Sequence, residues 1–470
     1  MPRTRILVTL GPSSGSPEII QRLLEAGVDA FRVNFSHGDD AEHRAVLRRI
    51  RDACRNAHRP AIRMADLQGP KIRLGEVPGG PVLLSPGSRL RLTPDPVPGD
   101  AGRMSVSLPD LLQVCHPGER ILLGDGVVEL RVEEVLGSEV RTTVIQGGSV
   151  GSHQGVFLPD AKLRPDILGA KDLHDLAVAL EEEVEWVALS FVQGAADLRL
   201  ARSRIRELAS DRWVGLVAKV ERKEAVENRE EILAEADALM VARGDLGIET
   251  PLPDLPWTQK MLIRAANQAG KPVIVATQML LSMVHSARPT RAEVTDVANA
   301  VLDGADCLML SDETAVGEFP VETVRYLTEI AERAEAIPPP PYGDLGPPRI
   351  LDSDEAAVAE AAIRLAQGIQ ARAIVVPTHS GRTARLVARL RPRIPMLVLT
   401  SQAETPAALG FTWGARCEEV PSHLPLEALR DMARRTAADV FGLKAGDKIV
   451  LTAGYPLEGR PTNLVTVAEV

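Results

Sequence analysis

The sequence predicts an α/β protein built around a (β/α)8 TIM barrel, with an inserted all-β lid domain and a C-terminal α/β domain. Three observations lead to this fold class. Short apolar runs alternate with helical patterns, and eight such runs precede residue 311. The alternation stops between about residues 74 and 158, where β-like runs alone recur. A proline-rich stretch, 337–348, then separates a third segment from the rest.

Eight β-like runs make a closed parallel barrel the economical architecture for the largest part of the chain. They lie at residues 5–10, 29–35, 60–66, 185–191, 214–220, 238–241, 272–276 and 307–310. The first helical pattern begins at Ser16-Pro17-Glu18, where a serine N-cap precedes proline and an acid. Others lie at 39–57, 171–183, 196–208, 222–236, 255–269, 292–303 and 321–336. The loops after barrel strands meet at one face, so we expect the chemistry there.

The segment between the third and fourth runs predicts a small all-β domain. Its β-like runs, 88–92, 120–123, 127–132 and 140–145, lie between turns rich in Gly, Pro and Asp. Such an insertion would emerge beside the site as a lid. We therefore expect the barrel at 1–72 and 164–337 and the lid at 73–163. The C-terminal domain is expected at 346–470, with β-like runs at 373–377, 396–400 and 448–452.

Composition excludes several classes of protein. A hydrophobic fraction of 45% over 470 residues argues against disorder, and a net charge of −10 argues against nucleic-acid binding as the main function. The sequence has no apolar run long enough for a membrane span, and Ile6-Leu7-Val8 is too short for a signal-peptide core. The four cysteines lie far apart, which favours reduced thiols and a cytoplasmic location.

Polar side chains follow the second and third runs. Strand alternation places Arg32, Asn34 and Ser36 on one side, a set that suits phosphate and a cation. Asp66 ends the third run, and Lys71 and Arg73 follow a Gly-Pro turn, which indicates an anion site facing a metal site. Taken alone, either segment also fits a solvated loop or a boundary turn with exposed charges.

The fifth and sixth runs supply a second polar set. Lys219, one of only nine lysines, and Glu221 leave the fifth strand on the same side. Gly244 and Gly247 allow close backbone approach to a ligand, although a tight turn is the plainer interpretation of that segment. Glu221 and Asp245 are hard oxygen ligands suited to Mg²⁺. Polar residues also follow the last two runs, at 277–278 and 311–314. Ordinary solvent exposure hardly explains polar residues after nearly every strand.

These motifs resemble those of the pyruvate kinase family over essentially the whole chain. The matching segments are 32–38, 66–73, 219–221, 240–247, 270–279, 288–300 and 302–310, in the family's order. The resemblance implies transfer of a phosphoryl group from phosphoenolpyruvate to ADP, giving pyruvate and ATP, with Mg²⁺ or Mn²⁺. The physical interpretation agrees, because phosphoryl transfer needs positioning and charge neutralisation more than covalent catalysis.

The resemblance also implies roles for individual residues. Arg32 would hold the transferring group, Lys219 would stabilise its charge, and Thr277 would orient the enolate for protonation. The metal would bind to Glu221 and Asp245, and the substrate carboxylate to the backbone N–H groups of Gly244 and Asp245. The remaining assignments are nucleotide phosphates at Asn34, Phe35, Ser36, His37 and Arg73, and a monovalent cation at Asn34, Ser36, Asp66 and the Leu67 carbonyl.

The sequence departs from the family pattern at four places. Lys71 stands where many members have glutamate, so its ammonium is expected to replace K⁺, which we predict is not required. Asp312 and Phe157 stand where glycine and asparagine are common. The segment 151–155 lacks the lysines that often precede Gly155, which leaves the lid contacts to nucleotide open.

The C-terminal domain carries a candidate effector site. A strand that ends in a loop of hydroxyls and glycine before a helix is an anion-binding arrangement, and in the family this loop binds effector phosphates. We expect a phosphorylated effector at Thr378, Ser380, Gly381 and Thr383, with residues 459–462 closing over it. The resemblance further implies a homotetramer with a subunit contact near 288–299.

Two other functions remain open from the sequence. One is another Mg²⁺-dependent barrel enzyme acting on phosphoenolpyruvate or an oxoacid, such as a carbon–carbon lyase, which would not need Arg73 or a lid. The other is a metabolite-sensing protein on an inactive barrel, against which Lys219, Glu221, Asp245 and Thr277 argue. The sequence leaves the effector, the preferred nucleotide and the direction of flux undetermined.

Overall fold

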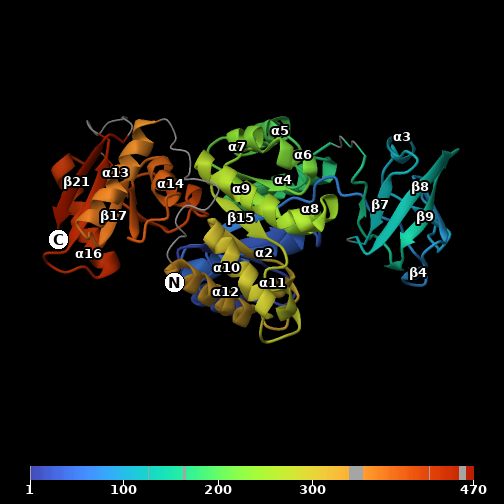
Figure 1. The fold of residues 1–470 in the computed structure, drawn as a ribbon. Helices are drawn as coiled ribbons and strands as arrows, with labels where there is room; N and C mark the ends of the chain where they lie inside the picture. The colour runs from blue at the N-terminus through green and yellow to red at the C-terminus, as the bar shows by residue number, and fades with distance from the viewer. Residues whose placement is uncertain are drawn as a thin grey trace.

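The computed structural model describes residues 2–124, 126–161, 163, 166–337, 353–422, 424–454 and 462–470. Eight parallel strands close into a barrel in the order β1-β16-β15-β14-β13-β12-β3-β2 (Figure 1). They are β1 (Arg5–Thr9), β2 (Ala30–Asn34), β3 (Ile62–Asp66), β12 (Trp186–Leu189), β13 (Gly215–Val220), β14 (Ala238–Ala242), β15 (Val273–Ala276) and β16 (Cys307–Leu310). The predicted barrel is confirmed, each strand within two residues of its run.

Helices surround the barrel and bury their apolar faces against it. They are α1 (Pro17–Ala26), α2 (Asp40–Asn56), α4 (Ala170–Glu181), α5 (Ala195–Leu208), α6 (Lys223–Glu227), α7 (Arg229–Glu235), α8 (Arg243–Glu249), α9 (Leu255–Ala269), α10 (Arg291–Asp303), α11 (Asp312–Ala315) and α12 (Pro320–Ala336), with 3₁₀ turns η1 (Leu252–Asp254) and η2 (Leu281–Val284). Ser16 caps α1 as predicted, accepting from the Ile19 N–H. The single helix predicted over 222–236 is wrong, because Asn228 leaves helical geometry and donates its side-chain N–H to the Gln193 carbonyl.

The inside of the barrel is filled at its amino end. Trp186, at the start of β12, is fully buried and meets the Phe411 ring edge-on at 4.9 Å between centroids. Its indole N–H donates to the Ala407 carbonyl at 2.9 Å. Residues 407 and 411 belong to the C-terminal segment, so that segment closes the floor of the barrel. The opposite, carboxyl end of the strands is left for ligands.

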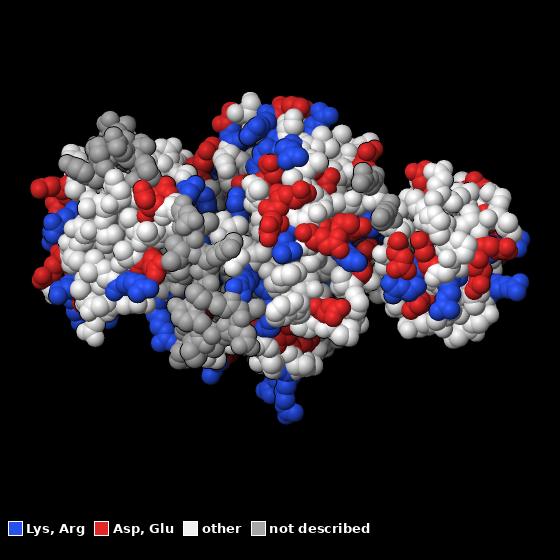
Figure 2. Space-filling view, turned by 45° about the horizontal axis from the view of Figure 1, so that its top comes forward, with Lys and Arg blue, Asp and Glu red and all other residues white. Residues whose placement is uncertain are grey.

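The inserted domain is all-β apart from the short helix α3 (Leu111–Val114). A six-stranded sheet runs β11-β7-β8-β9-β5-β6, and β10 pairs with β4. The strands are β4 (Val82–Leu84), β5 (Arg89–Thr93), β6 (Arg103–Ser105), β7 (Arg120–Leu123), β8 (Val128–Leu136), β9 (Glu139–Gln146), β10 (Gly148–Val150) and β11 (Val156–Phe157). This domain has its own hydrophobic core and forms a separate lobe beside the barrel (Figure 2). Acidic and basic side chains are interspersed over the face shown there.

The C-terminal domain is an α/β layer at the other side of the barrel (Figure 1). Its five-stranded sheet runs β19-β18-β17-β20-β21, with β21 antiparallel. The elements are α13 (Asp354–Gly368), β17 (Ala373–Pro377), α14 (Arg382–Ala388), β18 (Met396–Thr400), α15 (Thr405–Ala408), β19 (Ala415–Glu419), α16 (Leu426–Phe441), β20 (Lys448–Ala453) and β21 (Leu464–Glu469). Arg391 joins this domain to the barrel through a 3.1 Å ion pair with Asp306. Most of the proline-rich stretch lies outside the described residues.

Among the described residues, none of the helices combines the length and apolar character that crossing a membrane requires.

Candidate active site

A cluster of charged side chains lies at the carboxyl ends of β2, β3 and β13. The Asp66 carboxylate is its centre: Oδ2 accepts from Arg32 Nε at 2.6 Å, and Oδ1 lies 3.1 Å from Lys219 Nζ. Lys219 Nζ also lies 2.9 Å from Glu221 Oε1. Arg32 Nη1 donates to Thr9 Oγ1 at 3.0 Å. Strand alternation therefore brings together residues that the sequence placed on three separate runs.

The buried charges of this cluster stabilise one another. Burial alone would lower the pKa of Lys219, but the carboxylates of Asp66 and Glu221 outweigh burial and raise that pKa. Burial alone would raise the pKa of Asp66, yet Lys219 and Arg32 lower it overall. Lys219 is 8% exposed and remains an ammonium with Asp66 as its carboxylate partner. The cluster thus holds two cations at the barrel mouth, ready to face a developing negative charge.

Two carboxylates at this face supply hard oxygen donors. Burial raises the pKa of Glu221, and Asp245 adds to this effect although Lys219 opposes it. Glu221 Oε2 also accepts from the Phe191 N–H at 2.6 Å, which fixes the carboxylate. In the part of the chain that the structure describes, there is no group of three or more Asp, Glu, His or Cys side chains that could hold a metal ion. Two carboxylates with the remaining positions open to substrate oxygens fit Mg²⁺ or Mn²⁺.

Thr277 lies beside α8 in a left-handed conformation. Thr277 and Gln278 have φ of 67° and 55°, which is uncommon outside glycine and is held here by Arg243. The Arg243 guanidinium donates to the Thr277 carbonyl at 2.7 Å and pairs with Asp296 at 2.7 Å. Gly244 donates its N–H to Thr277 Oγ1 at 2.8 Å. The tight-turn interpretation of 244–247 is wrong, because these residues form part of α8.

Cations gather between the barrel and the lid. Burial lowers the pKa of His37, and Arg73, Lys71 and Arg32 lower it further. Lys71 Nζ lies 3.6 Å from Asp245 Oδ1, and Arg73 Nη1 donates to the His153 carbonyl in the lid at 3.0 Å. Such a positive region suits phosphate oxygens.

The residues expected around a monovalent cation are partly engaged with one another. Asn34 Oδ1 accepts from the Ser36 N–H at 3.1 Å. The Leu67 carbonyl accepts from Ser190 Oγ at 2.7 Å. Phe35 is fully buried, and its ring packs against that of His43 with 4.0 Å between centroids. Its carbonyl accepts from Lys171 Nζ.

Known proteins match this fold along nearly its full length. The family model "Pyruvate kinase, barrel domain" matches residues 1–324, and "Pyruvate kinase, alpha/beta domain" matches 356–468. The chain belongs to the pyruvate kinase family. It is 41% identical to the pyruvate kinase of Mycobacterium intracellulare and 42% identical to that of Corynebacterium glutamicum, covering 97% of this chain and 95% and 94% of theirs. A crystal structure of a Cryptosporidium parvum pyruvate kinase superposes with a TM-score of 0.91 at 34% identity, covering 100% of this chain and 96% of that one.

Membership of the pyruvate kinase family establishes the reaction. The enzyme transfers the phosphoryl group of phosphoenolpyruvate to ADP, the ATP-forming step of glycolysis, and the family generally uses a divalent metal ion. The carbon–carbon lyase and the inactive metabolite sensor are therefore set aside.

Sequence reasoning missed two side chains of this pyruvate kinase site. Ser190 follows β12 and accepts from Lys219 Nζ at 2.6 Å, which extends the cluster to a fourth strand. The same positional rule that found Asp66 would have found it, since it is the polar residue at the end of the fourth run. Arg243 is the second side chain that was missed. Its partner Asp296 lies 53 residues away in the sequence, so no local pattern indicates this contact.

The expected effector loop lies in the C-terminal domain, well away from the barrel mouth. Gly381 has φ of 77° and donates its N–H to Thr378 Oγ1 at 3.1 Å. The Thr383 hydroxyl is buried and lies 2.7 Å from that of Thr462. Ser380 lies within this turn, and Arg385 donates to its carbonyl at 3.2 Å. Residues 459–461 lie outside the described residues.

Proposed function

We propose that Arg32 and Lys219 carry the phosphoryl transfer in this enzyme. The observation that supports the proposal is the buried Lys219 ammonium, held between Asp66 and Glu221 beside the Arg32 guanidinium. Both cations lie at the end of the strands, where they would face the oxygens of the transferring group. Because these charges are already oriented, they stabilise the transition state without reorganisation.

Thr277, Gly244 and Asp245 hold the substrate in this proposal. The backbone N–H groups of Gly244 and Asp245 at the start of α8 receive the substrate carboxylate. Gly244 donates to Thr277 Oγ1 in the structure described here, so carboxylate binding would exchange that hydrogen bond. The exchange leaves the Thr277 hydroxyl with one partner, the Ala276 carbonyl, to which it donates at 2.6 Å, and the enolate would have to take that proton from this bond. Arg243 keeps Thr277 in position throughout, because it holds the Thr277 carbonyl and not its hydroxyl.

The divalent ion is assigned to Glu221 and Asp245, as Mg²⁺ or Mn²⁺. When bound, such an ion neutralises the charge on phosphoryl and enolate oxygens. The nucleotide phosphates are assigned to Asn34, Ser36, His37 and Arg73, with Phe35 contributing through its backbone alone. The cations that lower the pKa of His37 support this assignment.

K⁺ is not required in this proposal, because Lys71 supplies a positive charge in its place. The Lys71 ammonium lies 3.6 Å from Asp245 Oδ1, a carboxylate assigned to the divalent ion, so a positive charge already faces one of the carboxylates of the proposed site. Two cations about 4 Å apart repel by roughly 4 kcal/mol at an effective dielectric of 20. The Leu67 carbonyl, a candidate K⁺ ligand, is also engaged by Ser190.

Regulation and assembly complete the proposal. A phosphorylated effector binds at Thr378, Ser380, Gly381 and Thr383. The enzyme is a homotetramer with a contact between subunits near 288–299. Its four cysteines are free thiols, which supports a cytoplasmic location.

The Lys219→Met variant tests the catalytic assignment. We expect kcat to fall by at least about 10³-fold while phosphoenolpyruvate still binds, because the ammonium acts mainly on charge that develops in the transition state. A coupled assay for pyruvate measures turnover, and calorimetry measures phosphoenolpyruvate binding. Lys223→Met is the matched control, since Lys223 is exposed and pairs only with Glu227 among the described residues. An unchanged kcat in Lys219→Met would reject the assignment.

A further inference from the structure

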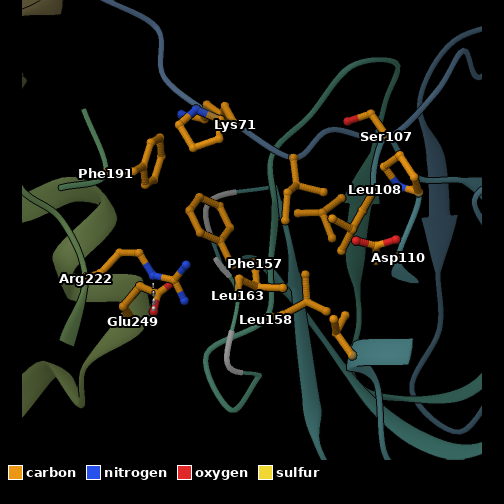
Figure 3. A pocket seen from close by; sticks show the side chains of 15 residues that line it. Lys71, Ser107, Leu108, Asp110, Phe157, Leu158, Leu163, Phe191, Arg222 and Glu249 are labelled. Carbon is orange, nitrogen blue, oxygen red and sulfur yellow. Dashed lines mark ion pairs between the residues drawn. The ribbon is translucent and has the colours of Figure 1, made fainter. Parts of the chain in front are cut away.

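A cleft of about 280 Å³ lies at the junction of the lid and the barrel, beside the catalytic centre (Figure 3). Its walls come from the segment that leaves the barrel after β3, from the lid, from the loops after β12 and β13, and from the end of α8. The lining residues are Pro70–Ile72, Ser107–Asp110, Val114, Val156–Leu158, Leu163, Phe191, Arg222 and Glu249. The volume lies just below the roughly 300–1,000 Å³ range of ligand pockets, which favours a small molecule over a nucleotide.

One wall of the cleft is apolar and aromatic. Phe157 from the lid and Phe191 from the barrel both face into it (Figure 3). Leu158, Leu163 and Val156 extend the same surface. Aromatic side chains stack on planar rings with favourable offset or edge-on geometry. This wall therefore suits a flat apolar body.

Arg222 supplies a buried cation on the barrel side of the cleft, the same side as Phe191 (Figure 3). The residue is 4% exposed, and its Nε and Nη2 atoms have no hydrogen-bond partner among the described residues. Its ion pairs are long, at 3.4 Å to Glu224 Oε2 and 3.7 Å to Glu249 Oε2. A buried donor without a partner costs free energy, and a planar carboxylate is the acceptor that matches the guanidinium fork.

We propose that this cleft binds a small aromatic carboxylic acid, with its ring against Phe157 and Phe191 and its carboxylate on Arg222. A monocarboxylate fits better than a phosphate dianion, because Glu249 and Asp110 also line the cleft. Burial raises the pKa of Glu249 to about 7, so near neutral pH this carboxyl is often protonated and tolerates a second carboxylate beside it.

Occupancy of the cleft has a consequence for turnover. The ligand would touch the lid and the barrel together, so it would hold the lid at its present distance from the barrel. Lid closure is commonly needed to exclude water from phosphoryl transfer. The bound acid therefore lowers kcat.

Calorimetric titration with 1-naphthoate tests the proposal. The wild-type enzyme is first saturated with phosphoenolpyruvate and Mg²⁺ in the absence of ADP, which occupies the carboxylate site of the catalytic centre. We expect saturable binding, weakened at least tenfold in both Arg222→Met and Phe157→Asn. The control Lys223→Met, which changes the adjacent exposed residue, should bind within twofold of wild type.

An uncharged analogue isolates the contribution of Arg222 without relying on any variant's folding. 1-Naphthamide should bind wild type at least tenfold more weakly than 1-naphthoate, and Arg222→Met should reduce this difference to less than threefold. Absence of naphthoate binding at millimolar concentration would overturn the proposal. Binding that phosphoenolpyruvate abolishes, or that both variants leave within twofold of wild type, would overturn it as well.

Discussion

Asp66 is the residue that positions the two cations proposed to carry the reaction. It is 1% exposed and touches both Arg32 and Lys219, so a single carboxylate orients two cations. A buried pair of this kind contributes little net stability, because desolvation offsets attraction. Its value is geometric: it fixes where two positive charges lie before the substrate arrives.

In the proposed site, the charge of Lys71 takes the place of a monovalent cation. Assayed in tetramethylammonium salts at fixed ionic strength, the wild type should be active, and added K⁺ should change its rate by much less than a hundredfold. Lys71→Glu should create a K⁺ requirement, because the variant places a carboxylate where a cation stood. Lys223→Glu makes the same exchange at an exposed position and should leave the response to K⁺ unchanged. A Lys71→Glu enzyme that works equally well without K⁺ would contradict the substitution of K⁺ by an ammonium.

Residues at strand ends could be predicted, whereas residues that act across domains could not. Asp66, Lys219 and Glu221 each end an apolar run, and the barrel architecture places such positions at one face. Arg222 follows β13, like Glu221, but its proposed role depends on Phe157, which lines the same cleft from the lid. No local pattern encodes that approach.

Helix α8 is the element that the sequence described least well. Its segment, Arg-Gly-Asp-Leu-Gly-Ile-Glu, contains two glycines, which lower helix propensity and make a turn the better local prediction. The helix forms because tertiary contacts hold its first residues: Gly244 bonds to Thr277, and Arg243 bonds to Asp296. The barrel strands were easier to predict, because strands that are buried on both faces appear in the sequence as continuous apolar runs.

Glu249, at the end of α8, should make the free energy of unfolding depend on pH. Burial raises the pKa of Glu249 from 4.5 to about 7, although Arg222 opposes this. The folded chain therefore holds this proton more tightly than the unfolded chain, so the stability the proton contributes is present below pH 4.5 and is lost as pH rises through 7. Glu249→Gln stays neutral and lacks this dependence.

Urea unfolding of both proteins measures the effect. The free energy of unfolding of wild type relative to Glu249→Gln should fall by on the order of 2 to 3 kcal/mol between about pH 5 and pH 8. An equal difference at both pH values would show that Glu249 does not titrate in this range.

At the scale of the whole molecule, the C-terminal domain, which carries the proposed effector site, also completes the core of the barrel. Phe411 fills the barrel floor against Trp186, so Phe411→Ala should destabilise the enzyme by about 3–5 kcal/mol. Its kcat should stay within twofold of wild type, because the catalytic cluster lies at the opposite end of the strands. Phe441→Ala, at a half-buried position in the same domain, should cost clearly less. Thermal and urea unfolding with parallel assays measure both, and an equal cost for the two variants would refute this role for Phe411.

The proposed effector site is tested by kinetics of the intact enzyme. Sugar phosphates and AMP are screened for a shift in the half-saturating phosphoenolpyruvate concentration. Ser380→Asp should abolish any such shift, because a carboxylate repels a phosphate in a loop closed by the Gly381–Thr378 hydrogen bond. If no compound shifts the concentration, or if Ser380→Asp leaves the shift intact, the effector binds elsewhere or does not exist.

The strand order of the barrel also constrains how the chain acquires its structure during synthesis. β1 pairs with β16, joining Arg5 to Cys307, and the floor is completed by Phe411. The first strand therefore stays without its second neighbour until some three hundred residues have left the ribosome, and the barrel interior stays open for about a hundred more. The inserted β domain has its own core and needs neither partner. Once residue 163 has left the ribosome, the nascent chain should thus already contain a folded lid, while the N-terminal strand is still accessible to chaperones.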